Sequence, residues 1–249
     1  MKNSIKKIRI FPTVTTISEL DSTISDSSWK DKIKEICKFG IEEIALFPTC
    51  LNGEKRKELY SLLENSSVKR IPFVHLRSDM ETSELEYLIR NYDTEVFNIH
   101  SKKEYSYPKD YLKFRDKICI ENVYYPLDKK EIENFSGVCI DFSHLENDRL
   151  LYKNKYEYNR EIIEKFLIKC NHISSIRKNA RLDSKNKYDK NSFRYDSHYL
   201  KKLSELDYLK NYPLKYFSCY CAIELENSIE RQLEIKDYIE ELLNLKKSL

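Results

Sequence analysis

Long hydrophobic runs are absent from this 249-residue sequence, and so are the features of a secretory signal. No apolar segment approaches the roughly 20 residues that a membrane-spanning helix requires. The first residues, MKNSIKKIRIFPTV, are basic but lack the apolar core and the small-residue cleavage site of a signal peptide. Glycine is scarce, with 3 residues, and we interpret this scarcity as a general bias of composition that does not indicate a function. These absences argue against a membrane-spanning or secreted class and predict a soluble cytoplasmic protein. Separately, we expect a monomer.

A paired-cysteine pattern is also missing, and the charge balance is nearly even. The seven cysteines follow no CxxC spacing, and Cys119, Cys139, Cys219 and Cys221 lie inside apolar runs. We expect buried, reduced thiols, because disulfide frameworks are typical of small secreted chains. Metal binding by Cys219 and Cys221 is the weaker alternative, since strand neighbours of the same parity more often serve packing. The net charge of +3 is too small to indicate a partner.

Short apolar runs alternate with longer amphipathic segments along the chain. The expected strands cover residues 7–12, 42–48, 70–76, 94–100, 117–122, 137–142, 172–178 and 216–224. The expected helices cover residues 28–39, 54–65, 81–91, 107–115, 127–135, 157–170, 198–209 and 227–246. Eight strand–helix repeats in about 250 residues match the count and size of a (β/α)8 barrel. We therefore predict an α/β fold, a single-domain TIM barrel over residues 1–249, with an open doubly wound sheet as the alternative.

Polar residues end six neighbouring strands in this prediction. Because side chains alternate along a strand, the last inward residue of each strand can be assigned by parity. The assignment gives His75, His100, Glu121, Asp141, Arg177 and Glu224, and His144, Asp196 and His198 follow in the loops. Active sites of TIM barrels lie at this end of the strands. His172 begins the expected seventh strand, so it is assigned a structural role at the opposite end, and Glu226 ranks behind Glu224.

A metal centre is the simplest explanation of these strand ends, because burying several carboxylates together is costly without a neutralising cation. A divalent ion suits mixed histidine and carboxylate ligands, and zinc or manganese fits that mixture. The predicted ligands are His75, His100, Glu121, Asp141, His144, Asp196, His198 and Glu224. Each residue alone also has a structural explanation, such as a hydrogen-bonded histidine or an acid paired with a lysine.

Residues 177–194, RKNARLDSKNKYDKNSFR, carry seven basic and two acidic residues and show no apolar periodicity. This composition predicts a long basic loop after the seventh strand. If the protein acts on a nucleic acid, the basic side chains of this loop would contact the backbone phosphates. They are Arg177, Lys178, Arg181, Lys185, Lys187 and Arg194. A solvated loop explains the same composition equally well.

In order along the chain, several short motifs resemble endonuclease IV, the abasic-site repair nuclease family within the xylose-isomerase-like barrels. They are VH (74–75), IH (99–100), CIEN (119–122), CIDFSH (139–144), DSH (196–198) and IE (223–224). The resemblance covers residues 40–245 and implies two or three Zn²⁺ ions, with Mn²⁺ as the alternative. It implies three sets of ligands: His75, His100 and Glu121 for the first ion; Glu121, Asp141, Glu224 and a strand-seven histidine for the second; His144, Asp196 and His198 for the third.

The expected seventh strand departs from the family. Arg177 stands there in place of the ligand histidine, and arginine cannot bind a metal. It would instead contact a phosphate. The resemblance therefore predicts a metal-dependent hydrolase that cleaves DNA at abasic sites or blocked 3′ ends, with catalytic residues Glu121, Glu224 and Arg177. Glu121 would bridge two metals, and Glu224 would orient or deprotonate the water.

Two alternatives remain open. A sugar isomerase or epimerase of the same superfamily would use one metal at Glu121, Asp141, strand seven and Glu224, and Arg177 weakens that interpretation most. A catalytically silent relative that binds nucleic acid or another partner is the third hypothesis.

Overall fold

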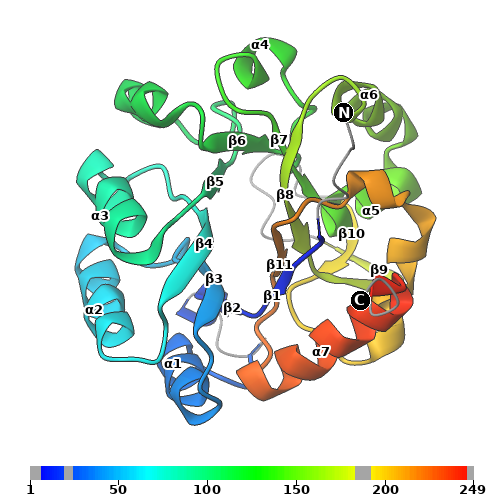
Figure 1. Cartoon of the computed structure of the whole chain (residues 1–249). Helices are drawn as coiled ribbons and strands as arrows, with labels where there is room; N and C mark the ends of the chain where they lie inside the picture. The colour runs from blue at the N-terminus through cyan, green and yellow to red at the C-terminus, as the bar shows by residue number, and fades with distance from the viewer. Residues whose placement is uncertain (1–6, 20–24, 183–191, 246–249) are drawn as a thin grey trace.

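The computed structural model describes residues 7–19, 25–182 and 192–245. One parallel sheet has the strand order β1-β11-β8-β7-β6-β5-β4-β3-β2. Its strands are β1 (Ile10–Phe11), β2 (Thr13–Thr15), β3 (Glu43–Phe47), β4 (Arg70–His75), β5 (Val96–Ile99), β6 (Ile118–Glu121), β7 (Val138–Asp141), β8 (Ile168–Ile173) and β11 (Cys221–Ile223). The predicted TIM barrel is confirmed, and Figure 1 shows the strands at the centre with the helices outside them.

The α-helices that surround the sheet are α1 (Trp29–Lys38), α2 (Gly53–Glu64), α3 (Thr82–Tyr92), α4 (Lys129–Ile132), α5 (Phe142–Leu151), α6 (Lys153–Ile163) and α7 (Ile229–Leu242). The 3₁₀ segments are η1 (Ile17–Glu19), η3 (Lys109–Phe114), η4 (Leu203–Asn211) and η5 (Leu214–Tyr216). Among the described residues, no helix is both long and apolar enough to cross a membrane.

The barrel closes at Pro12, which separates β1 from β2. Proline has no backbone N–H and therefore interrupts a ladder. Before it, Ile10 and Phe11 pair with β11; after it, Thr13–Thr15 pair with β3. The nine strands in the order above thus occupy eight positions, because β1 and β2 share one stretch of chain.

The side chain of Gln232 on α7 supports this seam. Its Oε1 accepts the backbone N–H of Thr13 at 2.7 Å, and its Nε2 donates to the carbonyl of Thr13 at 3.1 Å. The same Nε2 lies 3.2 Å from the carbonyl oxygen of Leu225 and 3.1 Å from that of Asn227. A fully buried amide therefore ties the first strand to the end of β11 and to the last helix.

Two apolar clusters hold the barrel together. The outer one lies between strands and helices and takes most of the buried leucine and isoleucine side chains. The inner one fills the barrel with Phe11, Ala45, Phe47, Phe73, Val96, Cys119, Cys139, Cys170 and Ala222. Inward and outward residues alternate along each strand, as closed parallel sheets require. The residues that follow this inner cluster along the strands form the rim of the barrel.

The expected seventh strand is wrong in its position. The expected range was 172–178, whereas β8 is Ile168–Ile173. Residues Ser175–Leu182 form a further strand, β9, which pairs with β10 (Phe193–Ser197) in a separate antiparallel hairpin. The described residues of the segment predicted as a basic loop, 177–182 and 192–194, thus lie almost entirely in these two paired strands. Lys185 and Lys187 lie outside the described residues.

Candidate metal centre

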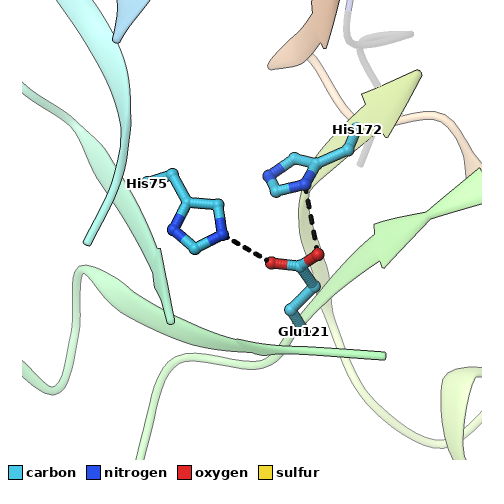
Figure 2. A group of neighbouring side chains, drawn as sticks. All are labelled: His75, Glu121 and His172. Atoms are coloured by element: carbon cyan, nitrogen blue, oxygen red, sulfur yellow. Dashed lines mark ion pairs between the residues drawn. The ribbon is translucent and has the colours of Figure 1, made fainter. Parts of the chain in front are cut away.

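Glu121 stands at the centre of the candidate site. It ends β6, and its carboxylate is 3% exposed. Its Oε2 lies 3.1 Å from Nε2 of His75, and its Oε1 lies 3.3 Å from Nδ1 of His172. Figure 2 shows the two oxygens facing the two imidazoles. The amide of Asn98 fixes this orientation by donating to Oε2 at 2.6 Å.

His172 belongs to this site, which corrects its predicted structural role. Its position in β8 follows from the pairing with β7, in which Cys139 faces Cys170 and Asp141 faces His172. His172 is therefore the last inward residue of the seventh strand, while Ile173 points outward into the outer core. The expected range of 172–178 began at His172 and therefore placed this residue at the wrong end of the strand.

The corrected end of β8 also places Arg177 outside the site. It lies on β9, and its Nη1 contacts the two carboxylate oxygens of Glu205 at 2.6 and 2.8 Å. Its Nη2 donates to the hydroxyl of Ser197 at 3.1 Å and to the carbonyl of Tyr199. The guanidinium thus holds the hairpin to η4. Arg177 does not occupy the strand-seven ligand position and does not lie beside Glu121.

Asp141 is the last residue of β7, and its carboxylate serves as the N-cap of the next helix, α5. Its Oδ1 caps α5 by accepting the backbone N–H of His144 at 2.9 Å and the hydroxyl of Ser143 at 2.7 Å. Asn122 holds the strand end by donating to the Asp141 carbonyl at 3.0 Å and accepting its N–H at 2.9 Å. The second oxygen, Oδ2, is left to face the site.

The ligand atoms form three overlapping groups whose members lie within 4.8 Å of one another. The groups are His75, Glu121 and His172; Glu121, Asp141 and His144; and Asp141, His172 and Glu224. Nδ1 of His172 lies 3.2 Å from Oε2 of Glu224 and 3.8 Å from Oδ2 of Asp141. Glu121, Asp141 and His172 each belong to two groups, so neighbouring cations would share their ligands.

His100 stands at the edge of these groups. Its Nε2 is 3.7 Å from Oε2 of Glu121, and its Nδ1 is 3.1 Å from Oε2 of Glu104. Glu104 also accepts the backbone N–H of Tyr124 at 2.9 Å through its Oε1. Sequence reasoning missed this carboxylate, which orients the imidazole in the way that many metal-binding histidines are oriented.

Asp196 and His198 are brought to the same rim but are held differently. Oδ2 of Asp196 lies 3.8 Å from Nδ1 of His144, and both Asp196 oxygens receive hydrogen bonds from the guanidinium of Arg194. Nδ1 of His198 lies 3.4 Å from the hydroxyl of Ser174 and from the carbonyl of Glu224. Within the described ranges, these two residues join none of the compact ligand groups.

The charges of the site favour a cation. Burial acts to lower the pKa of His172, but Glu121 and Glu224 outweigh it and raise that pKa well above its usual value. Burial acts to raise the pKa of Glu224, but His172 and His198 bring it down to about 2. Burial, with Glu224 and Glu121, raises the pKa of Asp141. Protonated imidazoles thus offset the carboxylates wherever no metal does so.

Several buried atoms at this rim fit a bound ion. Among the described residues, no hydrogen-bond partner of acceptable geometry is found for Oδ2 of Asp141, Oε2 of Glu224 or the two ring nitrogens of His172. Buried polar atoms normally have partners, so such a set is typical of a binding site. Imidazole and carboxylate donors suit Zn²⁺ or Mn²⁺. The residues present therefore fit the divalent ions that the sequence predicts.

A cavity of about 420 Å³ opens above these ligands. Its walls include His75, His100, His144, His198, Glu121 and Glu224. Arg77, Arg194, Tyr105 and Tyr124 also line it. The cavity thus combines the ligands with cationic and aromatic side chains.

The other basic residues and Glu226 lie elsewhere. Lys178 and Arg181 are exposed on β9, and among the described members of the basic set only Arg194 lines the cavity. Glu226 is fully buried and pairs with Lys32 at 3.0 Å. That pair supports the start of α1 and takes Glu226 out of the ligand set, in agreement with its lower rank.

No protein-family model matches this chain, and no curated protein matches it. One similar solved structure is an uncharacterised protein from Parabacteroides distasonis ATCC 8503, 14% identical, with a TM-score of 0.43 over 94% of this chain and 99% of that one. Another is an HpcH/HpaI aldolase from Desulfitobacterium hafniense DCB-2, 10% identical, with a TM-score of 0.43 over 99% of this chain and 95% of that one. These likenesses are too remote to assign a function.

Proposed function

We propose that this protein is a metal-dependent phosphodiesterase of the endonuclease IV type, acting on DNA. One observation supports the proposal above all others: Glu121, His75, His172, Asp141 and Glu224 converge at the ends of five strands in overlapping ligand groups. In this proposal His172 would be the histidine that the family resemblance requires on strand seven. The second ion would then not depend on Arg177.

When bound, divalent ions at these ligands would activate water and stabilise the charge of a phosphoryl group. The chain's own residues set the conditions for that chemistry. Glu121 can bridge two ions because its oxygens face different imidazoles. Glu224, kept ionised by His172 and His198, has an oxygen without a hydrogen-bond partner, and it can hold and orient a water. Asn98 and Asn122 hold Glu121 and Asp141 in place.

The cavity walls favour a phosphate-bearing substrate. Arg77 and Arg194, which pair with Asp79 and Asp196, place guanidinium groups beside the ligands, and Tyr105 and Tyr124 provide flat aromatic surfaces. The exposed Lys178 and Arg181 on β9 would extend this contact along a nucleic-acid backbone. We propose duplex DNA with an abasic site or a blocked 3′ end as the substrate, cut 5′ to the lesion.

A sugar isomerase or epimerase is the second candidate, and one observation favours it. Glu121, Asp141, His172 and Glu224 form the complete quartet that such an enzyme needs for one metal, now that His172 replaces Arg177 in it. His75, His100 and His144 add imidazoles around that quartet, which a single-metal site does not require. The nuclease is therefore the proposal that uses more of the site.

The deciding experiment is cleavage of a labelled duplex that carries one abasic analogue, with protein purified without chelator. The preparation is also chelated and reloaded with Zn²⁺ or Mn²⁺, and bound metal is counted. Metal-dependent cutting 5′ to the lesion with two or three ions supports the proposal. One ion per chain and isomerisation of a sugar would support the alternative, and folded, metal-loaded protein that does neither would indicate a silent binding protein.

A further inference from the structure

A second cavity, of about 440 Å³, lies between the segment that follows β5 and the helix α4. Its lining is rich in basic residues: Lys102, Lys103, Lys109 and Lys130. The acidic residues of the same lining are Asp128 and Glu131. The charge that this cavity presents to a ligand therefore depends on what already binds the two carboxylates.

Glu131 is bound by three groups of the segment after β5. Its Oε2 accepts the hydroxyl of Ser101 at 2.7 Å, and its Oε1 accepts the backbone N–H of Lys102 at 2.7 Å. The same Oε1 accepts the hydroxyl of Tyr107 at 2.6 Å. Glu131 thus uses its carboxylate to hold this segment against α4, and the three donors it binds are neutral groups.

Asp128 is occupied as well. It caps the start of α4 and lies 3.2 Å from Nζ of Lys103. Within the described ranges, no ion pair is formed by the other three lysines of the cavity, which are exposed: Lys102, Lys109 and Lys130. The four lysines exceed the two carboxylates by two charges, so the cavity is a place where an anion is stabilised.

The floor of the cavity is apolar. The rings of Tyr107 and Phe135 meet edge to face, with their centroids 5.8 Å apart. Leu112 lies beside them and is 48% exposed. Phosphate and sugar alternate along a nucleic-acid strand, and proteins contact both. A basic rim around an apolar floor fits such a strand better than it fits a free phosphate ion.

The segment between β5 and η3 lies between this cavity and the metal cavity. Tyr105 of that segment lines the metal cavity, and Oε2 of Glu104 lies 3.1 Å from Nδ1 of His100. Lys102 and Lys103 of the same segment line the second cavity. A strand bound at the metal centre therefore has only one short segment to cross before it reaches the lysines.

We propose that Lys102, Lys109 and Lys130, with Tyr107, Leu112 and Phe135, form a groove that binds the backbone of a DNA strand beyond the metal cavity. The inference rests on the proposed phosphodiesterase function, whose site includes none of these residues. The ammonium groups would neutralise backbone phosphates and release their counterions. The basic residues of β9 lie elsewhere around the barrel (Figure 1), so this lysine groove would be a second contact with the substrate.

The test is the salt dependence of DNA binding by the full chain. Fluorescence anisotropy measures the affinity of the wild type and of K102Q/K109Q/K130Q for a labelled, undamaged duplex over a series of salt concentrations. Each phosphate contact contributes about 0.9 to the slope of log affinity against log salt, so the triple variant should lower that slope by about 2–3. Its affinity at about 100 mM salt should fall at least about 10-fold.

Two matched variants show whether the position and the charge of the lysines matter. K7Q/K38Q/K165Q removes the same charge from exposed lysines that precede barrel strands, at the end opposite the metal centre, and should change the slope by less than about 1. K102R/K109R/K130R keeps the charge and should keep the slope. Circular dichroism checks folding, and if the glutamine triple variant does not fold, the single variants decide, each with an expected loss of about 0.9.

Equal slopes in the glutamine variants of the groove and of the opposite end would overturn the proposal. A wild type that does not bind the duplex would overturn it too. Cleavage of the abasic duplex is measured in parallel. Cutting with equal slopes removes the groove and leaves the phosphodiesterase, whereas a lower slope in the groove variant without any cutting keeps the DNA contact and removes the phosphodiesterase.

Discussion

The two sides of the barrel rim solve the same electrostatic problem differently. On the side of β6, β7 and β8, the carboxylates of Glu121 and Asp141 face imidazoles and retain an unpartnered oxygen at Asp141. On the hairpin side, Asp196 is buried to the same degree, yet Arg194 already binds both of its oxygens. Burial acts to raise the pKa of Asp196, but Arg194 and His144 bring it well below its usual range.

This difference teaches which carboxylates depend on a cation from outside the chain. An acid with its own arginine is stable without metal, whereas acids paired only with histidines can exchange protons for metal. We therefore expect the centre at Glu121 to hold its ions firmly and the position at Asp196 to hold an ion weakly or not at all.

The largest effect is expected from E121Q. Loss of a group that merely supports a metal ligand costs about 10–100-fold in affinity, so loss of the shared ligand itself should cost at least about 100-fold. The measurement is metal content after dialysis and a Zn²⁺ titration. E86Q, the same change at an exposed position of α3, is the control. Unaltered metal affinity in E121Q would contradict the site.

A pair of variants on the seventh strand and its extension should differ sharply. H172A should reduce metal affinity about 10–100-fold, because His172 belongs to two ligand groups. R177A should leave metal content unchanged and lower the free energy of unfolding by about 1–3 kcal/mol through the lost contacts with Glu205. Metal titration and urea denaturation measure both. Metal loss in R177A would restore the original assignment of that residue.

Removing Arg194 should make the hairpin side resemble the other. In R194Q the carboxylate of Asp196 loses its cationic partner, and a metal beside His144 becomes the available replacement. In R194Q we expect the Zn²⁺ affinity beside Asp196 and His144 to rise a few-fold. The metal content per chain should then rise toward one additional ion. The double variant with D196N is the control. Equal metal content in R194Q and wild type would show that Asp196 is not a ligand.

The smallest expected effect is a pH dependence at His100. Burial acts to lower its pKa, but Glu121 and Glu104 raise it from 6.5 to about 9. In metal-free protein, the stabilisation from the charged imidazole is thus complete below pH 6.5 and lost as pH rises through 9. Urea denaturation at pH 6, 7.5 and 9 should show this loss, and H100Q should reduce it. If the free energy of unfolding of H100Q falls with pH as steeply as that of the wild type, another group causes the effect.

The fold was largely predictable because alternating apolar runs and amphipathic helices are local patterns. Seven of the eight expected strand ranges contain a whole barrel strand, and parity placed His75, Glu121 and Asp141 correctly on the inner face. Local sequence also explains Asp141 and His144 together, since an aspartate three residues before a helical N–H is a normal cap.

The seventh strand was not predictable in the same way. Residues 168–182 are extended through both β8 and β9, with a break only at Ser174, so apolar runs do not mark where the barrel ends. The register against β7 decides which residues point inward, and this is a contact between distant segments. A one-residue change of parity exchanges His172 for its neighbours and turns Arg177 into an apparent site residue.

The buried amide of Gln232 has a consequence for biosynthesis. The first strand gains its second neighbour only when β11 forms, and α7 then secures the seam through Gln232. A nascent chain that has not yet produced β11 and α7 therefore has an open sheet, with two exposed edges and no Glu224 at its rim. The ion-binding site is then complete only after β11 and Glu224 have been made. The complete set of ligands is therefore not available to a metal during most of synthesis.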